Sequence, residues 1–273
     1  MKSILPTLLL AALLAACAPA SPVTTPQAAV NPESAPVELT VLAASSLTEP
    51  FSEIGVLFEA AHPGVKVNFS FAGSQQLAQQ ISEGAPVDVF ASASQKHMDA
   101  LVSSGQVDAV EQVVFARNRL VVILPRDNPA NLQSLADLAR PGIKVDLAAA
   151  EVPVGKYSLE FLEHASLDPT LGAGYKDAVL ANVVSYEDNV KAVLTKVALG
   201  EADAGIVYTS DVSGKEDAIQ QIAIPEDLNV IASYPIAALN QSARRELAQA
   251  FVELVLSPAG QAVLAKYGFI PAE

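Results

Sequence analysis

Four turns in the sequence lead into helix-like segments, and the first two of them follow strand-like runs and carry hydroxyl-bearing residues. They lie at residues 43–48, 71–75, 153–156 and 188–190, and the first two contain Ser46 and Ser74. The first N–H groups of a helix have no acceptor within the helix and carry the positive end of its dipole, so they can bind an anion without a charged side chain. Each serine alone could be an ordinary N-cap. Because several such turns follow predicted strands, the pattern favours an anion-binding cleft.

The sequence lacks the motifs of common enzymes. It contains no Gly-x-Ser-x-Gly elbow, P-loop, Gly-x-Gly-x-x-Gly or His-Glu-x-x-His. A hydrolase using Ser46 or Ser74 as nucleophile would need a histidine base beside it. His62, His97 and His164 all lie on predicted helices or helix ends, outside the four turns. The sequence therefore predicts a binding protein that is not an enzyme and needs no cofactor.

The beginning of the chain is typical of an exported protein. Lys2 precedes an apolar run over residues 4–14, which is too short to span a bilayer as a stable helix. Residues 14–17, Leu-Ala-Ala-Cys, resemble the lipobox of bacterial lipoproteins, in which the cysteine is lipidated and becomes the mature N-terminus. Cys17 is the only cysteine, so we predict a signal peptide over 1–17 and an extracytoplasmic protein anchored to a membrane by lipid. The alternative is a plain secretory signal with an accidental cysteine.

Composition limits what the rest of the chain can be. Residues 18–36, rich in Pro, Ala, Thr and Ser, predict a flexible tether. The remainder of the 273 residues, with an overall hydrophobic content of 51%, could form one large domain or two lobes. No later segment is apolar for long enough to cross a membrane. The net charge of -14 argues against binding to nucleic acid or to anionic membrane surfaces.

Strand-like and helix-like segments alternate along the body of the chain, which favours an α/β fold with mainly parallel sheets flanked by helices. Strands are expected at 37–42, 65–71, 87–90, 119–124, 144–148, 204–208 and 230–239. Helices are expected at 48–61, 74–83, 95–103, 156–165, 189–200, 243–257 and 258–267. A C-terminal strand and helices that return to the first lobe would join two lobes through crossovers near 115–117 and 231–234. We therefore predict lobe 1 over 37–117 and 232–273, lobe 2 over 118–231, and a ligand in the cleft between them.

Several motifs resemble the molybdate-binding component of bacterial ABC importers, the ModA-type family of periplasmic binding proteins. These are residues 41–47 (VLAASSL), 71–74 (FAGS), 84–93 (GAPVDVFASA), 152–157 (VPVGKY), 205–211 (GIVYTSD), 234–237 (YPIA) and 266–269 (KYGF). The resemblance covers the chain from about Glu38 to its end. It implies a type II two-lobed periplasmic-binding-protein fold, a monomer, and an ABC permease with its ATPase subunit as partners.

The resemblance also implies a ligand shell of five residues: Ser46, Ser74, Val154, Val190 and Tyr208. The serines would give a hydroxyl and a backbone N–H each, the valines a backbone N–H each, and the tyrosine its phenol O–H. The sequence departs from the family pattern at four positions in or beside this shell, namely Val154 and Ser45 in place of alanines and Gly73 and Gln75 in place of serines.

A shell made only of donors suits a ligand made only of acceptors. Molybdate at neutral pH is a fully deprotonated tetrahedral dianion, whereas phosphate retains a proton and would favour an acceptor in the site. We therefore predict capture of molybdate, and of tungstate, with the metal held through its oxygens and no direct bond from protein to metal. Sulfate, another tetrahedral dianion, is the alternative within this class. Capture of Fe(III) would need several tyrosines and carboxylates, and Tyr208 alone is not sufficient.

Overall fold

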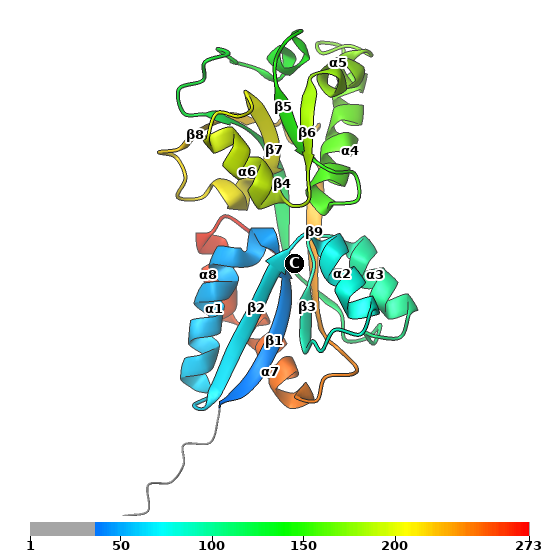
Figure 1. Cartoon of the computed structure of the whole chain (residues 1–273), viewed down its shortest axis with the longest axis vertical. Helices are drawn as coiled ribbons and strands as arrows, with labels where there is room; N and C mark the ends of the chain where they lie inside the picture. Colours follow the sequence, from blue (N-terminus) through cyan, green and yellow to red (C-terminus); the bar gives the residue numbers. More distant parts are fainter. Residues whose placement is uncertain (1–35, 273) are drawn as a thin grey trace, which may run out of the picture. The chain divides into compact units, whose positions relative to one another are not determined.

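Strands and helices alternate along residues 36–272, the part of the chain that this computed structural model describes (Figure 1). The strands are β1 Val37–Ala44, β2 Val65–Ala72, β3 Val89–Ala91, β4 Val113–Pro125, β5 Val145–Ala148, β6 Val183–Glu187, β7 Ala204–Tyr208, β8 Ile219–Ala223, β9 Ile231–Ala238 and β10 Ile270–Pro271. The α-helices are α1 Thr48–Ala61, α2 Ser74–Ser82, α3 Gln95–Ser103, α4 Pro153–Leu167, α5 Tyr175–Ala181, α6 Val190–Ala198, α7 Arg245–Leu256 and α8 Pro258–Lys266. Short 3-10 helices lie at η1 Ser45–Leu47, η2 Leu135–Ala139 and η3 Thr209–Val212. The predicted signal peptide, Cys17 and residues 18–35 of the predicted tether lie outside the described residues.

The strands form two lobes that share two long strands. In lobe 1, β1 pairs in parallel with β2 and β3, and β3 pairs antiparallel with β9. In lobe 2, β5 pairs in parallel with β6 and β7, and β7 pairs antiparallel with β4. Strand β4 pairs with β9 over its first half and with β7 and β8 over its second half, so it belongs to both lobes. Figure 1 shows β4 and β9 running between the two lobes.

This topology confirms the predicted two-lobed α/β fold and refines it. The expected parallel pairing holds within β2-β1-β3 and within β6-β5-β7, whereas β4, β8, β9 and β10 pair antiparallel with their neighbours. A strand that crosses from one lobe to the other and another that returns must run in opposite directions, which explains the antiparallel pair of β4 and β9. The predicted lobe boundaries fall within β4 and at the start of β9 and stay predictions.

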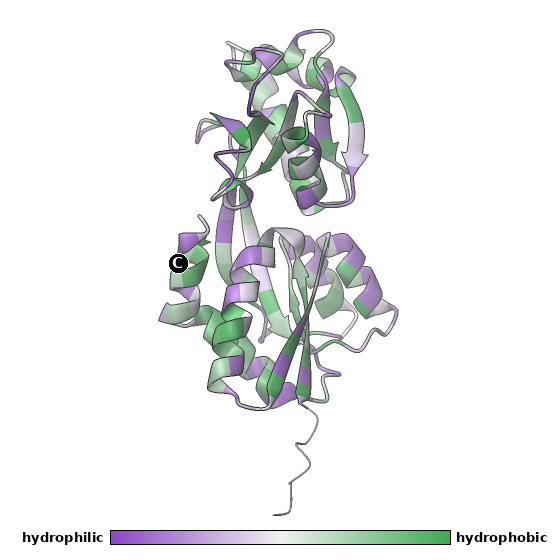
Figure 2. Cartoon of the chain, turned by 60° about the vertical axis from the view of Figure 1, so that its left-hand side comes forward, coloured by the Kyte–Doolittle hydropathy of each residue, from purple (hydrophilic) through white to green (hydrophobic). Residues whose placement is uncertain are grey.

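Apolar side chains on one face of each element build the core of lobe 1. Helix α1 buries Phe51, Ile54 and Phe58 at the spacing of one helical face. The ring of Phe51 lies 5.7 Å from that of Phe115 and 5.9 Å from that of Phe251, measured between centroids. Figure 2 shows the same division, with hydrophobic residues along the inner strands and hydrophilic residues on the outer faces of the helices. These contacts fix α1, and with it the turn that precedes it.

Four strands and α-helices were missing from the sequence-based prediction: β10, which spans only two residues, and β6, β8 and α5, for which there are also physical reasons. Strand β6 exposes Val184 and Tyr186, and β8 contains two exposed glutamines, so neither has the apolar run of a buried strand. Helix α5 spans only seven residues. Strand β4 begins six residues earlier than expected because polar residues such as Asn118 pair with β9.

Helix α4 begins at Pro153 instead of Lys156. Proline is favoured in the first turn of a helix, where its missing N–H is not needed. This earlier start places Val154 within the first turn. Among residues 36–272 no single helix has the length and apolar character of a membrane span, and α7 with α8 meets that test only as a pair bent by 59°.

A donor-lined pocket between the lobes

The five residues predicted to bind the ligand line one pocket. Its wall consists of Ala44, Ser45, Ser46, Ala72, Gly73, Ser74 and Ala93 from lobe 1 and Val152, Pro153, Val154, Val190 and Tyr208 from lobe 2. The room inside is small: the centre of a water-sized sphere can occupy only about 10 Å³ of it, roughly what a single water molecule needs. The pocket therefore suits a small ion better than a sugar, an amino acid or a peptide.

Four helix starts converge on this pocket, two from each lobe. Ser46 lies in η1, which leads into α1, and Ser74 is the first residue of α2. Val154 is the second residue of α4, and Val190 is the first residue of α6. At these positions the backbone N–H groups have no acceptor within their own helix. The helix dipoles add to the positive potential, so the pocket attracts an anion although the chain is acidic overall.

The hydroxyl of Ser74 has its own proton free for a partner in the pocket. The backbone N–H of Ala93 donates to Ser74 Oγ over 3.0 Å, and the side chain of Ser74 is buried. A backbone N–H can only donate, so Ser74 Oγ is the acceptor in this bond. The serine keeps its own proton for another acceptor, and the pocket is where that acceptor can lie.

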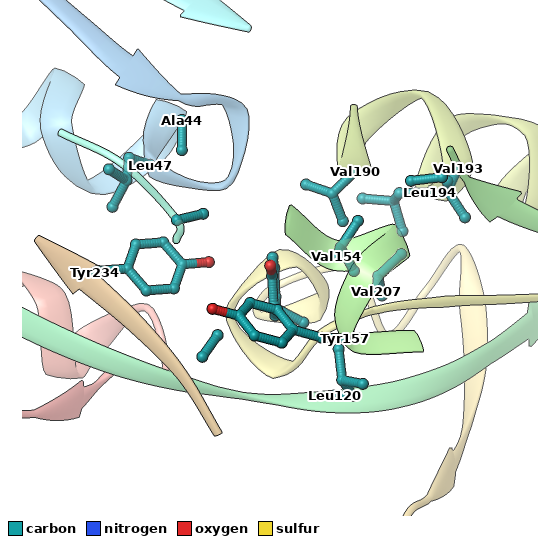
Figure 3. Close-up of a cluster of buried hydrophobic side chains, with 14 of the residues drawn as sticks. Ala44, Leu47, Leu120, Val154, Tyr157, Val190, Val193, Leu194, Val207 and Tyr234 are labelled. Carbon is teal, nitrogen blue, oxygen red and sulfur yellow. The ribbon is translucent and has the colours of Figure 1, made fainter. Parts of the chain in front are cut away.

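The hydroxyl of Ser46 makes one hydrogen bond, with a tyrosine from the crossover strand β9. Ser46 Oγ lies 3.0 Å from Tyr234 Oη, and both side chains are buried. In Figure 3 the hydroxyl of Tyr234 points away from β9 toward the middle of the cluster that also contains Val154 and Val190. The side-chain amide of Asn118 on β4 approaches Tyr234 Oη to 3.4 Å. Neither Tyr234 nor Asn118 was among the residues predicted to bind the ligand.

Tyr208 brings a hydroxyl without a partner. Its side chain is 1% exposed, and among the described residues no group hydrogen bonds to its Oη. Burial raises the pKa of Tyr208 well above its ordinary value, so the phenol stays protonated and can donate. A buried polar group without a partner costs about 1–3 kcal/mol, which a bound acceptor would recover.

The lining residues of the described structure include no carboxylate and no histidine. Asp211 is a buried acid whose Oδ2 accepts the backbone N–H of Tyr208 over 3.2 Å and whose Oδ1 lies 3.5 Å from Lys191 Nζ. Burial raises the pKa of Asp211 to about 6. Asp211 thus holds the backbone of Tyr208 from behind and does not line the pocket.

Side chains of the two lobes meet around the rim of the pocket. Gln75 Nε2 donates to the carbonyl of Asp188 over 2.9 Å, and His97 Nε2 donates to the carbonyl of Glu151 over 3.3 Å. Across the same gap, Lys191 Nζ lies 2.7 Å from a carboxylate oxygen of Glu49. The two lobes are therefore in direct contact, as in a closed clamp.

This contact explains two of the departures from the family pattern. A Cβ added at Gly73 would lie 2.4 Å from the carbonyl oxygen of Asp188, so only glycine fits at this approach. Gln75, beside it, reaches the same carbonyl with its amide. The family pattern has serine hydroxyls on both sides of Ser74. In this chain Gly73 instead allows the two lobes to approach closely, and Gln75 forms a hydrogen bond between them.

Comparison with known proteins identifies a group to which this architecture is similar. Residues 39–270 match the family described as bacterial extracellular solute-binding protein. The chain is 38% identical over 261 residues to the molybdate-binding protein ModA of Mycobacterium tuberculosis H37Rv, covering 96% of this chain and 94% of that protein.

Two solved structures share the fold. The substrate-binding domain of a putative molybdenum ABC transporter from Clostridium difficile is 31% identical, with a TM-score of 0.65, over 87% of this chain and all of that one. The sulfate-binding protein SubI of M. tuberculosis is 20% identical, with a TM-score of 0.78, over 87% of this chain and 88% of that one. At that identity the second similarity concerns the fold alone.

Proposed function

Because this chain belongs to the family of bacterial extracellular solute-binding proteins, we propose that it captures molybdate, and tungstate equally well, and delivers it to an ABC importer. The proposed ligands of the anion are the hydroxyls of Ser46, Ser74 and Tyr208 and the backbone N–H groups of Ser46, Ser74, Val154 and Val190. The metal is held through its oxygens, without a direct bond to the protein.

The observation that carries the proposal is the one-sided chemistry of the pocket. Ser74 has a proton free to donate, Tyr208 has a buried hydroxyl without a partner among the described residues, and four helix starts supply N–H groups. A fully deprotonated dianion satisfies all of these groups and requires no acceptor in return. Neutral donors in a closed site of low dielectric act strongly without a charged side chain. The names of the relative that is 38% identical and of the solved domain that is 31% identical support molybdenum as the element.

Sulfate is the second candidate, because it has the charge and shape of molybdate and needs the same donors. Its bonds are shorter, so the size of the donor cage must separate the two anions. A cage built on four helix ends that are packed into two cores resists contraction. Each donor left out of reach costs about 1–3 kcal/mol, so two such losses would weaken sulfate by a few orders of magnitude.

A hydrolase remains the alternative from a different class, and the pocket argues against it. A serine nucleophile at position 46 or 74 would need a general base within hydrogen-bond reach. His62, His97 and His164 all lie outside the lining residues. Ser46 bonds to a tyrosine hydroxyl and Ser74 to a backbone N–H, neither of which can take a proton from the serine at neutral pH.

We propose further that the protein works outside the cytoplasm as a lipoprotein anchored through Cys17, with residues 18–36 as its tether. Its partners in this proposal are the anion, an ABC permease and the ATPase subunit of that permease, and the protein itself acts as a monomer. Detergent-phase partitioning tests the anchor. The protein should enter the detergent phase and Cys17→Ser should not, and equal partitioning of the two would refute the anchor.

Calorimetric titration tests the proposed ligand. The purified protein should bind molybdate and tungstate with similar affinity, and Ser74→Ala should weaken both about tenfold to a hundredfold because it removes a donor that both use. Ser82→Ala is the matched control, since Ser82 lies at the far end of the same helix and bonds only to the carbonyl of Ala78. No binding of either anion, or equal affinities for Ser74→Ala and the control, would contradict the proposal.

A further inference from the structure

We infer that Tyr234 is a specificity-determining residue: with Asn118 it fixes the direction of the Ser46 hydroxyl, so that the pocket rejects oxyanions that carry a proton. The inference rests on the proposed function, in which Ser46 is a ligand of the anion. Tyr234 does not line the pocket, and it acts through the serine.

The direction of the chain of hydrogen bonds is set at Asn118, which is fully buried on β4. The backbone N–H of Arg119 donates to Asn118 Oδ1 over 3.0 Å, and the hydroxyl of Thr209 donates to the same oxygen over 3.0 Å. Because the backbone N–H can only donate, the oxygen of the amide must face it. The amide nitrogen therefore faces the other way, toward Ser210 Oγ at 2.7 Å and Tyr234 Oη at 3.4 Å.

The orientation of the Asn118 amide also determines which group donates in the hydrogen bond between Tyr234 and Ser46. An amide nitrogen can only donate, so Tyr234 Oη is the acceptor from Asn118 and has its single proton left to give. Its other hydrogen-bond partner is Ser46 Oγ, at 3.0 Å. Tyr234 is fully buried, and burial raises its pKa well above the ordinary value, which keeps the phenol protonated. Ser46 Oγ is thus the acceptor in this bond, and its own proton is free to point into the pocket.

The result is a pocket in which both serines are donors for different reasons. Ser74 is fixed by the backbone N–H of Ala93, which no side-chain substitution can remove. Ser46 is fixed by Tyr234, which a substitution can remove. If Ser46 accepted a hydrogen bond from a protonated anion, its own proton would have no acceptor on the side of Tyr234.

Hydrogen phosphate meets this arrangement with a group that the pocket cannot satisfy. At pH 8 it carries the same charge as molybdate but keeps one O–H, which needs an acceptor. In the intact pocket this O–H faces only donors and is left unsatisfied, which weakens binding. Without the hydroxyl of Tyr234, the side chain of Ser46 can rotate and accept from the anion.

The test compares molybdate with hydrogen phosphate in a double-mutant cycle at pH 8. We expect Tyr234→Phe to weaken molybdate about tenfold and to lower the ratio of molybdate to phosphate affinity at least as much. In a Ser46→Ala background, Tyr234→Phe should change neither affinity, because its effect passes through that serine. Tyr175→Phe is the matched control, since it removes a buried hydroxyl that bonds to the carbonyl of Leu135, away from the pocket.

A second variant tests the direction without removing the tyrosine. In Asn118→Asp the side chain can only accept, so Tyr234 would donate to it and would accept from Ser46. The ratio of molybdate to phosphate affinity should fall here too, because both anions carry the same charge and the added carboxylate repels them equally. Thermal unfolding shows whether each variant is folded.

An unchanged affinity ratio in folded Tyr234→Phe, or the same loss in the presence and absence of the Ser46 hydroxyl, would overturn the inference. The failure of the proposed function looks different. A wild-type protein that binds sulfate and not molybdate refutes the assignment of the anion, and the same cycle, run with sulfate against hydrogen phosphate, still decides the role of Tyr234. A wild-type protein that binds no tetrahedral anion overturns both.

Discussion

Gly155, the third residue of α4, allows this helix to start close against the end of β5. A Cβ added to Gly155 would lie 2.0 Å from the carbonyl oxygen of Ala149 and 2.4 Å from that of Ala148. Both neighbours are backbone atoms, so no side chain can rotate away. In Gly155→Ala the start of α4 must therefore move by about 1 Å to restore an ordinary contact.

That displacement reaches the pocket directly, because Val154 precedes Gly155 in the chain. An N–H···O hydrogen bond spans about 2.7–3.2 Å, so a shift of about 1 Å takes the Val154 N–H out of range of the anion. The loss of one such donor costs about 1–3 kcal/mol, which corresponds to a loss of affinity of roughly tenfold to a hundredfold. Forcing the extra methyl into the packed region should also lower the free energy of unfolding by about 1–3 kcal/mol.

Calorimetry with molybdate and urea unfolding measure these two effects separately. Gly174→Ala is the control, because Gly174 precedes α5 with φ of -91° and no atom lies within 4 Å of the added Cβ. The control should keep both its affinity and its stability. The reasoning would be refuted if Gly155→Ala bound molybdate as tightly as the wild type.

Two further predictions concern charges outside the pocket. Glu49→Gln removes the ion pair with Lys191 between the lobes and leaves the contact of Lys191 with Asp211 in place, so molybdate should dissociate about threefold to tenfold faster in stopped-flow measurements. Lys66→Met, which breaks a pair with Glu59 within lobe 1, should leave that rate unchanged, and equal rates for all three proteins would contradict the role of the pair. Asp146 is fully buried, and burial raises its pKa to about 7, so the native state holds this proton more tightly than the unfolded chain and loses stability as the pH rises from about 4 to 7. Asp146→Asn should therefore raise the unfolding free energy by a few kcal/mol at pH 8 and by much less at pH 5, and a gain that does not depend on pH would exclude this explanation.

The proposed ligand residues could be placed in one pocket from the sequence because their signals are local. Ser46 and Ser74 each lie where an apolar strand is followed by a helix. A turn of this kind can be recognised from the few residues on either side of it. Val154 and Val190 could be placed through motifs around them, although nothing about a valine side chain indicates binding. The structure brings all of them to one pocket because the parallel strands of each lobe end at the edge that faces the other lobe.

The residues behind the pocket could not be predicted, because their partners are distant in sequence. Tyr234 lies 188 positions from Ser46, and Asn118 lies 116 positions from Tyr234. Their meeting depends on the antiparallel register of β4 and β9, which pairs Asn118 with Ala232. Tyr234 belongs to a motif that supported the resemblance, so the sequence marked the position without indicating its role. Lys191 likewise resembles an ordinary surface lysine until lobe 2 places it beside Glu49.

The edges of lobe 2 escaped prediction for a different reason. Strands β6 and β8 are half-exposed, so solvent tolerates polar residues along them, and their sequences lack the apolar run that marks a buried strand. Pairing with β5 and β4 makes them strands. The missing β6 did not prevent the prediction of Val190, because the turn at residues 188–190 and the apolar face of α6 could be recognised without it.

A competition titration of the purified protein tests the central claim most directly. Molybdate is loaded first, and tungstate, sulfate and hydrogen phosphate are added as competitors at pH 8. A rigid cage of donors predicts that tungstate displaces molybdate at about equal concentration, and that sulfate and hydrogen phosphate fail to do so even at a hundredfold excess. Displacement by sulfate at equal concentration would contradict the molybdate assignment, and displacement by hydrogen phosphate would contradict a pocket made only of donors.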